Sequence, residues 1–414
     1  MDDTLMTRRE LLWRAGVLTL GTMMLPFDLP RFVLAPLGVA PAGDVLVCVF
    51  LRGAADGLTL VAPMGDRDYF AARPTLALTD KGTDAALPLD TFFGVPPALK
   101  PLKEIFDAGA LAIVHAVGSP DPTHSHFDAM DFMERGTPGE KSIPTGWIGR
   151  HLQVMASRNT SPFRAIGMGT VLQQSLRGPV PATALQSIAD FHLQGDAKRL
   201  EPFQQALAAL YSGDGWIETQ GTLTLQTMRD LTKLASSAYT PANGAVYPDT
   251  PFGKAMANVA QLIKAEIGVE VACADLGGWD THVQQEAQLP RLADELAKTL
   301  AAFYTDLLDG IKRVTLVTMT EFGRRVKENG GRGTDHGHGS VMFIMGGGIN
   351  GGKVYGDWLG LAADKLYGPG DLAITTDFRD VLGEVVQKRL GNTNLATVFP
   401  NYIPKFRGIA RELA

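Results

Sequence analysis

Residues Val314–Gly348 read VTLVTMTEFGRRVKENGGRGTDHGHGSVMFIMGGG. The segment begins and ends with apolar, β-branched runs, Val314–Thr320 and Val341–Met345, so both ends predict buried strands. The polar loop between the two runs carries carboxylate and imidazole groups, which bind hard or borderline cations: Glu321, Asp335, His336 and His338. The loop therefore predicts a metal site, although solvated side chains around a glycine turn would share the pattern.

Two other loops carry the same kinds of side chain directly after apolar runs. One reads DPTHSHFDAMD (residues 121–131), and the other reads DLGGWDTH (residues 275–282) and contributes Asp280 and His282. Five of the eight histidines of the chain lie in the three loops: His124, His126, His282, His336 and His338. Histidines that merely pack in a core would not cluster in this way, so the repetition strengthens the metal hypothesis.

Apolar runs alternate with helical patterns along most of the chain. The strands predicted at Val45–Leu51, Ala110–Val117 and Val269–Asp275 are separated by predicted helices such as Ala98–Gly109. This order is typical of an α/β fold with a doubly wound, mostly parallel sheet and helices on both faces. We expect one such domain over residues 43–414, with a helical insertion near residues 175–247.

In a doubly wound sheet, the loops at the carboxyl ends of the strands surround a shared crevice. We therefore expect six side chains from these loops to meet: Asp56, Ser125, Asp280, His282, Glu321 and His338. Arg52 and Arg324 lie in the same loops, and a guanidinium fork matches two oxygen atoms of a phosphate or a sulfate. Both arginines are candidate substrate-binding residues, unless they are solvated surface charges.

Ser125 lies between His124 and His126, where a predicted strand gives way to a helix. Free N–H groups at a helix N-terminus favour negative charge, and a hydroxyl beside a divalent cation can attack phosphorus or sulfur. These three residues are therefore candidate catalytic residues, with Thr123 as a second candidate nucleophile. Ser125 and Asp128 also match a helix cap, and the two roles are compatible.

The first 42 residues have the features of an export signal. Arg8 and Arg9 precede an apolar stretch (residues 15–26), and residues 40–42 (APA) provide a small-residue cleavage site. The T-R-R-x-L-L pattern resembles a twin-arginine signal, so the twin-arginine translocase is an expected partner and the periplasm or the cell exterior is the expected location. Only this segment is expected to meet a membrane. The alternative is an uncleaved membrane anchor or an amphipathic N-terminal helix.

Composition excludes several classes of function. The chain has 414 residues, of which 45% are hydrophobic and 20% charged, so it can bury a large core. A net charge of −6 and the lack of a long basic run argue against nucleic acid as a partner. Cys48 and Cys273 both lie inside apolar runs, so neither a disulfide nor a thiolate metal site is expected.

Seven motifs in order carry a resemblance to a known family: LRGAADGL, THSHFDAMDFMERG, GWIGRHL, DLGGWDTH, TEFGRR, GTDHGHG and DFRDVLGEVV. Together with the export signal, they resemble the exported domain-of-unknown-function family 1501, which is grouped with the alkaline phosphatase and sulfatase superfamily. The resemblance covers essentially the whole chain after the signal. It implies an alkaline phosphatase-like fold and a two-metal hydrolase.

The resemblance also implies roles for single residues. Ser125 takes the nucleophile position, and the implied metal ligands are Asp56, Asp280 or Asp275, His282, Glu321, and His338 or His336. The implied cofactor is a divalent metal such as zinc, manganese or calcium. Phe322 departs from the pattern, because it stands where the superfamily motif has a histidine ligand.

Two functions fit these observations. The first is an exported, metal-dependent hydrolase of phosphate or sulfate esters, acting on a small molecule or a polysaccharide. The second is a non-catalytic exported protein that kept the fold and uses the crevice to bind a polysaccharide or an assembly partner. Phe322 motivates the second hypothesis, since it removes one expected ligand.

Overall fold

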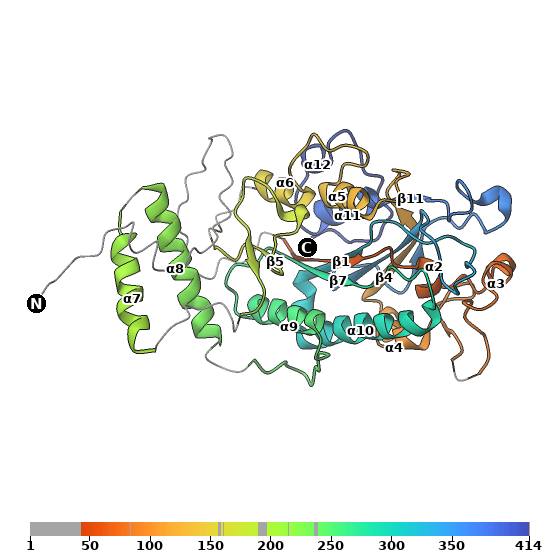
Figure 1. Ribbon diagram of the computed structural model, residues 1–414, viewed down its shortest axis with the longest axis horizontal. Coiled ribbons are helices and arrows are strands. Elements are labelled where there is room, and N and C mark those ends of the chain that lie inside the picture. The colour runs from red at the N-terminus through yellow and green to blue at the C-terminus, as the bar shows by residue number, and fades with distance from the viewer. Residues whose placement is uncertain are drawn as a thin grey trace, which may run out of the picture. The chain divides into compact units, whose positions relative to one another are not determined.

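The computed structural model of the chain describes residues 43–82, 84–155, 159, 161–188, 197–213, 215–235 and 239–413 (Figure 1). The expected export signal over residues 1–42 lies outside the described residues. Within the described ranges, no helix has both the length and the apolar character that a membrane crossing requires.

A mixed sheet of nine strands forms the centre of the described part of the chain. Its order is β10-β4-β9-β8-β1-β7-β5-β6, and β11 also pairs with β4. The strands are β1 (Val45–Arg52), β4 (Leu111–Gly118), β5 (Ala165–Met168), β6 (Thr183–Leu185), β7 (Val271–Gly277), β8 (Val314–Met319), β9 (Ser340–Gly346), β10 (Val354–Tyr355) and β11 (Thr376–Asp377). The pairings are parallel except those of β9 with β4 and β8, which confirms the predicted α/β fold with a mostly parallel sheet.

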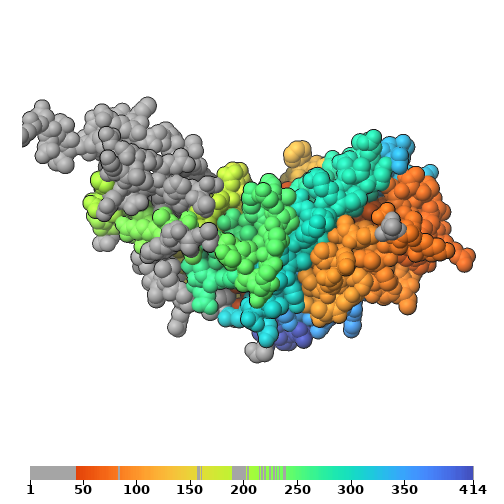
Figure 2. Space-filling view, turned by 90° about the horizontal axis from the view of Figure 1, so that it is seen from below, coloured from red at the N-terminus to blue at the C-terminus, as the bar shows by residue number. Residues whose placement is uncertain are grey.

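Helices cover both faces of the sheet, as the alternating pattern predicted (Figure 1). The side chains of β1 alternate between the two cores: Val47 and Val49 pack on one face, and Leu46 and Cys48 pack on the other. The first face is covered by α4 (Lys100–Asp107), α9 (Pro251–Lys264) and α10 (Gln285–Asp306), whose outer surfaces are seen in Figure 2. The second face is covered by α5 (His126–Arg135), α6 (Trp147–Val154), α11 (Phe378–Lys388) and α12 (Leu395–Val398).

Local sequence signals fix where the helices begin and end. The hydroxyl of Thr250 accepts a hydrogen bond from the N–H of Gly253 at 3.0 Å, and Pro251 then opens α9. Helix α5 ends at Gly136, which adopts the left-handed conformation (φ 67°) that a side chain would disfavour. A single N-cap contributes about 1 kcal/mol, so these residues set boundaries while the buried faces supply most of the stability.

The range of the expected helical insertion, residues 175–247, contains α7 (Ala197–Leu210) and α8 (Trp216–Ala235). It also contains β6, which pairs with β5 and extends the sheet. The prediction did not include this strand. The remaining short elements are α2 (Gly57–Leu60), α3 (Arg67–Ala72), β2 (Leu87–Pro88), β3 (Gly94–Val95), η1 (Pro97–Leu99), η2 (Gln174–Leu176), η3 (Gly310–Arg313) and η4 (Ala363–Lys365).

The direction of β9 determines how the loops meet. Strands β1, β4, β7 and β8 run the same way, so the loops that follow them lie at one edge of the sheet. Strand β9 runs the opposite way, and it therefore begins at that same edge. As a result, the segment between β8 and β9 both leaves and returns at the edge where the other polar loops gather.

Candidate metal centre

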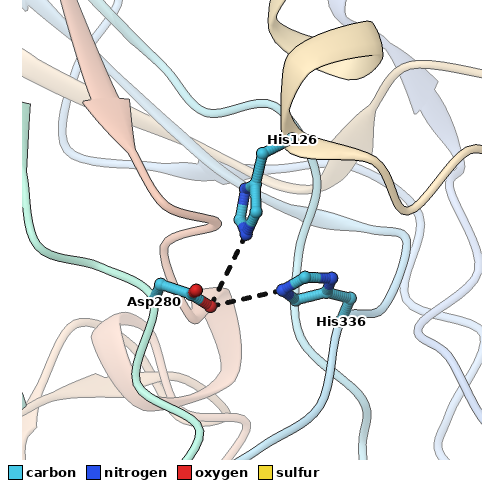
Figure 3. Close-up of side chains that lie close together, drawn as sticks. All are labelled: His126, Asp280 and His336. Carbon is cyan, nitrogen blue, oxygen red and sulfur yellow. Dashed lines mark hydrogen bonds and ion pairs between the residues drawn. The ribbon is translucent and has the colours of Figure 1, made fainter.

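Three side chains from three loops meet at this edge of the sheet (Figure 3). His126 is the first residue of α5, Asp280 follows β7, and His336 precedes β9. The Nε2 atoms of His126 and His336 lie 3.6 and 3.2 Å from Oδ1 of Asp280. One ligand atom from each of the three residues lies within 4.8 Å of the others, so together they can hold a metal ion.

The imidazole of His126 is oriented by Glu321. Its Nδ1 donates a hydrogen bond to Oε1 of Glu321 at 2.7 Å, and the Gly53 N–H donates to the same oxygen at 2.8 Å. The Nε2 of His126 is buried and has no hydrogen-bond partner in the described structure. A carboxylate behind a histidine is the arrangement that aims the other ring nitrogen at a metal. The hydrogen bond to Glu321 also raises the pKa of His126.

His336 is oriented in the same way by a backbone carbonyl. Its Nδ1 lies 3.1 Å from the carbonyl oxygen of His124 and donates to it, which directs Nε2 toward Asp280. Burial lowers the pKa of His336, so the neutral imidazole that binds metals is favoured.

A hydrogen bond and an ion pair with Arg324 fix the position of Asp280. The buried Arg324 guanidinium donates to Oδ1 of Asp280 at 2.6 Å. Burial would raise the pKa of Asp280, but the hydrogen bond and charge of Arg324 outweigh it and lower this pKa to about 2. The remaining hydrogen bonds of the Arg324 guanidinium go to backbone carbonyls of Gly53, Ala54, Trp279 and Thr334. Asp280 is thus a fixed and ionised carboxylate at neutral pH.

His282 is a fourth ligand candidate beside the three. Its Nε2 lies 3.0 Å from both Oδ1 of Asp280 and Nε2 of His336. Its side chain is 40% exposed, more than those of His126 and His336. Imidazole nitrogens combined with a carboxylate suit zinc and other borderline divalent metals.

Phe322 forms an apolar floor under the imidazoles. Its ring centroid lies 5.0 Å from that of His126 and 4.9 Å from that of His336, and the residue is buried. A phenylalanine side chain has no atom that could bind a metal ion. Its packing restricts the two imidazoles that are candidate ligands.

Two expected ligands have other partners. Glu321 is buried and contacts His126 through a hydrogen bond, so it supports a ligand from behind. The ring of His338 stacks on Tyr367 with centroids 4.3 Å apart and does not belong to the group of three. Burial lowers the pKa of His338 to about 4.

Asp56, an expected metal ligand, is engaged by internal partners in the structure. Its carboxylate is buried and accepts hydrogen bonds from Arg73 at 2.5 and 3.0 Å, and further ones from Thr59 and Gln285. Burial would raise the pKa of Asp56, and the Arg73 guanidinium outweighs it and lowers this pKa. With its oxygens engaged in this network, Asp56 holds the loop after β1 together, and it does not belong to the group of three.

The two expected substrate-binding arginines also form ion pairs with carboxylates of the protein itself. Arg324 is buried beneath Asp280, so it cannot reach a substrate. Arg52 forms ion pairs with Glu134 at 3.3 Å and with Asp275 at 2.9 Å. These two carboxylates outweigh its single positive charge, and Arg52 therefore ties α5 to β7 and offers no anion site. The same pairing engages Asp275, the alternative to Asp280.

The candidate nucleophile lies next to the centre in the chain. Ser125 caps α5, with Oγ accepting a long hydrogen bond of 3.5 Å from the Asp128 N–H, and its side chain is partly exposed. Its neighbour His124 lies 3.4 Å from Oδ2 of Asp371, measured from Nε2. The sequence analysis missed Asp371, because it lies in irregular chain with no motif around it.

The fold and the site define an α/β protein with a candidate histidine-carboxylate metal centre at the carboxyl edge of its sheet. Over residues 107–394, the sequence matches the family described as "Protein of unknown function (DUF1501)". The chain belongs to this family. No curated protein sequence matches it significantly.

Several solved structures are similar to this one. PsFucS1 sulfatase from Pseudoalteromonas sp. has 10% identity and a TM-score of 0.39, over 89% of this chain and 74% of that chain. Alkaline phosphatase from the Antarctic bacterium TAB5 has 10% identity and a TM-score of 0.29, over 74% of this chain and 92% of that one. The C-terminal periplasmic domain of EcEptC from Escherichia coli, in complex with Zn, has 9% identity and a TM-score of 0.33, over 76% and 77%.

Proposed function

We propose that this protein is an exported, metal-dependent hydrolase of phosphate or sulfate esters. One observation carries the proposal: the buried Nε2 of His126 lacks a partner and faces Asp280, beside His336. Each of the two imidazoles has its Nδ1 engaged by an oxygen acceptor, so Nε2, which faces Asp280 in both, is the nitrogen that would bind a cation.

His126, Asp280 and His336 would hold the metal, with His282 as a fourth ligand. A divalent cation bound there supplies Lewis acidity that neutralises charge on a phosphate or sulfate group. Arg324 keeps Asp280 ionised, and Glu321 keeps His126 in the tautomer that presents Nε2. Zinc and manganese both accept this ligand set.

Ser125 is the proposed nucleophile. It lies at the N-terminus of α5, where unpaired N–H groups stabilise an anionic oxygen. Its Oγ would form a bond to phosphorus or sulfur while the bond to the ester oxygen breaks, and the released alcohol takes up a proton. Water then cleaves the serine ester. Thr123 is the second candidate for this role.

The export part of the proposal rests on the twin-arginine pattern at Arg8 and Arg9. It makes the twin-arginine translocase a partner and places the ester substrate in the periplasm or outside the cell. Replacing both arginines with lysine should keep the protein in the cytoplasm, as cell fractionation would reveal. Unchanged export of that variant would contradict export through the twin-arginine translocase.

Metal content and turnover of the purified full chain test the catalytic proposal. We expect about one divalent metal per chain, loss of that metal in His126→Ala and Asp280→Asn, and hydrolysis of aryl phosphates or aryl sulfates that stops on chelation. Asp249→Asn, at an exposed carboxylate outside the site, is the matched control and should keep both properties. Turnover that survives both chelation and Ser125→Ala would contradict the proposal.

A second candidate function is metal-dependent binding without catalysis. It is favoured by the commitment of Arg324 and Arg52 to internal partners, since neither guanidinium is free to hold a transferring phosphate. A protein that binds metal and ligand but turns over no ester in a broad panel would support it. Turnover that disappears in Glu321→Ala would exclude it.

A further inference from the structure

Two exposed apolar side chains directly follow histidines of the metal centre. Phe127 follows His126 in the first turn of α5 and is 85% exposed. Val283 follows His282 and is 57% exposed. Each of the two therefore lies one residue from a group that faces Asp280.

A third exposed side chain, the aromatic ring of Tyr367, contacts the loop that carries His338. Tyr367 is 41% exposed and stacks on His338, and its backbone pairs with that of Asp371 through hydrogen bonds of 2.9 Å. The Asp371 carboxylate in turn faces Nε2 of His124 at 3.4 Å. Tyr367 is thus anchored beside both histidine-containing loops. We call Phe127, Val283 and Tyr367 the apolar rim.

Phe127 and Val283 each adjoin a histidine of the centre in the chain, and Tyr367 stacks on His338 of the loop that also carries His336. A cation held by the histidines and the carboxylate of the centre would attract an anionic head group. Phenylalanine and valine side chains offer no hydrogen bonds, and removing their surface from water is favourable. A ligand with an anionic end and an apolar body would satisfy both the cation and the apolar side chains.

We infer that the apolar rim binds the alcohol part of the substrate, and that the substrate is a phosphate or sulfate ester of an apolar alcohol. Phe127 is the principal specificity-determining residue, because it is the most exposed of the three and the largest apolar group without a polar tip. The inference deepens the proposed function and rests on the same metal centre.

Two phosphonates, which cannot be hydrolysed, separate the apolar contact from catalysis. Phenylphosphonate and methylphosphonate carry the same anionic head group, and their binding to the zinc-loaded full chain can be measured by calorimetry. We expect phenylphosphonate to bind about tenfold more tightly, consistent with burial of one aromatic ring. Phe127→Ala should reduce this preference several-fold, and Phe127→Leu should keep part of it. Ile403→Ala is the control, because Ile403 is 86% exposed and belongs to none of the loops of the centre.

Equal affinity for the two phosphonates, or binding of neither by the zinc-loaded chain, would overturn the inference. An undiminished preference in Phe127→Ala would do the same. If the preference depends on Phe127 but no ester is turned over, the hydrolase proposal fails and the inferred substrate fails with it. If esters are turned over with no dependence on Phe127, the inference alone fails. If Phe127→Ala instead converts a dimer to a monomer in sedimentation, the apolar rim is an interface between copies and the inference is overturned. A chain that binds no metal removes both proposals.

Discussion

Glu321 accepts a hydrogen bond from Nδ1 of His126 at 2.7 Å, and this contact sets which nitrogen of the imidazole faces the candidate metal centre. Replacing a carboxylate in this position typically costs 10–100-fold in metal affinity. We therefore expect Glu321→Gln to weaken zinc binding by about that factor, as measured by competition with a chelator. Glu140→Gln, at an exposed glutamate, should bind zinc like the wild type. Equal affinity in both variants would show that Glu321 does not orient the ligand.

Metal affinity should fall as the solution becomes more acidic. His126 must be neutral to bind a cation, and the hydrogen bond to Glu321 raises its pKa above the ordinary value of 6.5. Below that raised pKa, the apparent affinity should drop by about tenfold per pH unit, because one proton competes for the site. Burial and Arg324 together set the pKa of Asp280 at about 2, so protonation of Asp280 does not change the zinc affinity in this pH range. Zinc titrations between pH 5 and 8 would measure the dependence of affinity on pH. An affinity that does not change with pH would exclude His126 as a ligand.

Arg324 should be required for folding as well as for the site. Its loss removes the donor to three backbone carbonyls and the guanidinium ion pair with Asp280, so we expect Arg324→Ala to destabilise the protein by roughly 3–5 kcal/mol in urea unfolding. Arg324→Lys should recover little, because an ammonium cannot reproduce the planar fork. The control Arg291→Ala, at an exposed arginine, should stay within about 0.5 kcal/mol of the wild type.

Asp56 separates structural carboxylates from metal ligands. Asp56→Ala leaves the buried Arg73 guanidinium unpaired, and breaking such a pair typically costs about 3–5 kcal/mol. The variant should therefore unfold at lower urea concentration while it still binds the same amount of metal per folded chain. A variant that keeps its stability but loses the metal would restore Asp56 as a ligand.

His115 should make the fold sensitive to acid. Its Nε2 contacts the Val61 carbonyl and its Nδ1 accepts from the Ala116 N–H, both at 2.8 Å, so the neutral ring is fully satisfied. Burial lowers the pKa of His115 to about 4, and the unfolded chain therefore takes up this proton more readily. The contribution to stability is complete above pH 6.5 and is lost as the pH falls toward 4.

That loss amounts to roughly 3 kcal/mol, because the pKa falls from 6.5 to about 4 and each pKa unit corresponds to about 1.4 kcal/mol. Urea unfolding of the metal-free protein at pH 7.5 and 4.5 measures it. The metal-free form removes the competing effect of metal release. His115→Gln should show a smaller difference between the two pH values than the wild type, and an equal difference would rule out this histidine as the cause.

The sequence predicted the centre of the fold well, because its strands are long, apolar and separated by clear helices. The run Val45–Leu51 corresponds to β1 almost residue for residue. The short strands β6, β10 and β11 carry only two or three residues each, too few for a periodic signal. The reversed direction of β9 was also beyond prediction, because an apolar run does not indicate which way a buried strand points.

The sequence analysis predicted which loops lie together more accurately than it predicted the contacts of each residue. Parallel strand order brings the loops of His126, Asp280 and His336 to one edge, and the sequence pattern contained that order. Whether a carboxylate or guanidinium in those loops faces inward or outward depends on packing, which no motif encodes. Asp56 forms an ion pair with Arg73, and Arg324 forms one with Asp280. The expected metal ligand and the expected substrate-binding arginine are therefore both engaged by groups of the protein itself.

The reversed strand β9 has a practical consequence for the integrity of the molecule. The segment from β8 to β9 is tethered at both ends to the sheet, while Lys327, Gly330, Gly331 and Arg332 are exposed along its course. A protease that cuts after Lys327 or Arg332 would therefore produce two fragments, each keeping a strand within the same sheet. We expect such a nicked protein to stay in one piece during gel filtration and to separate only in denaturant.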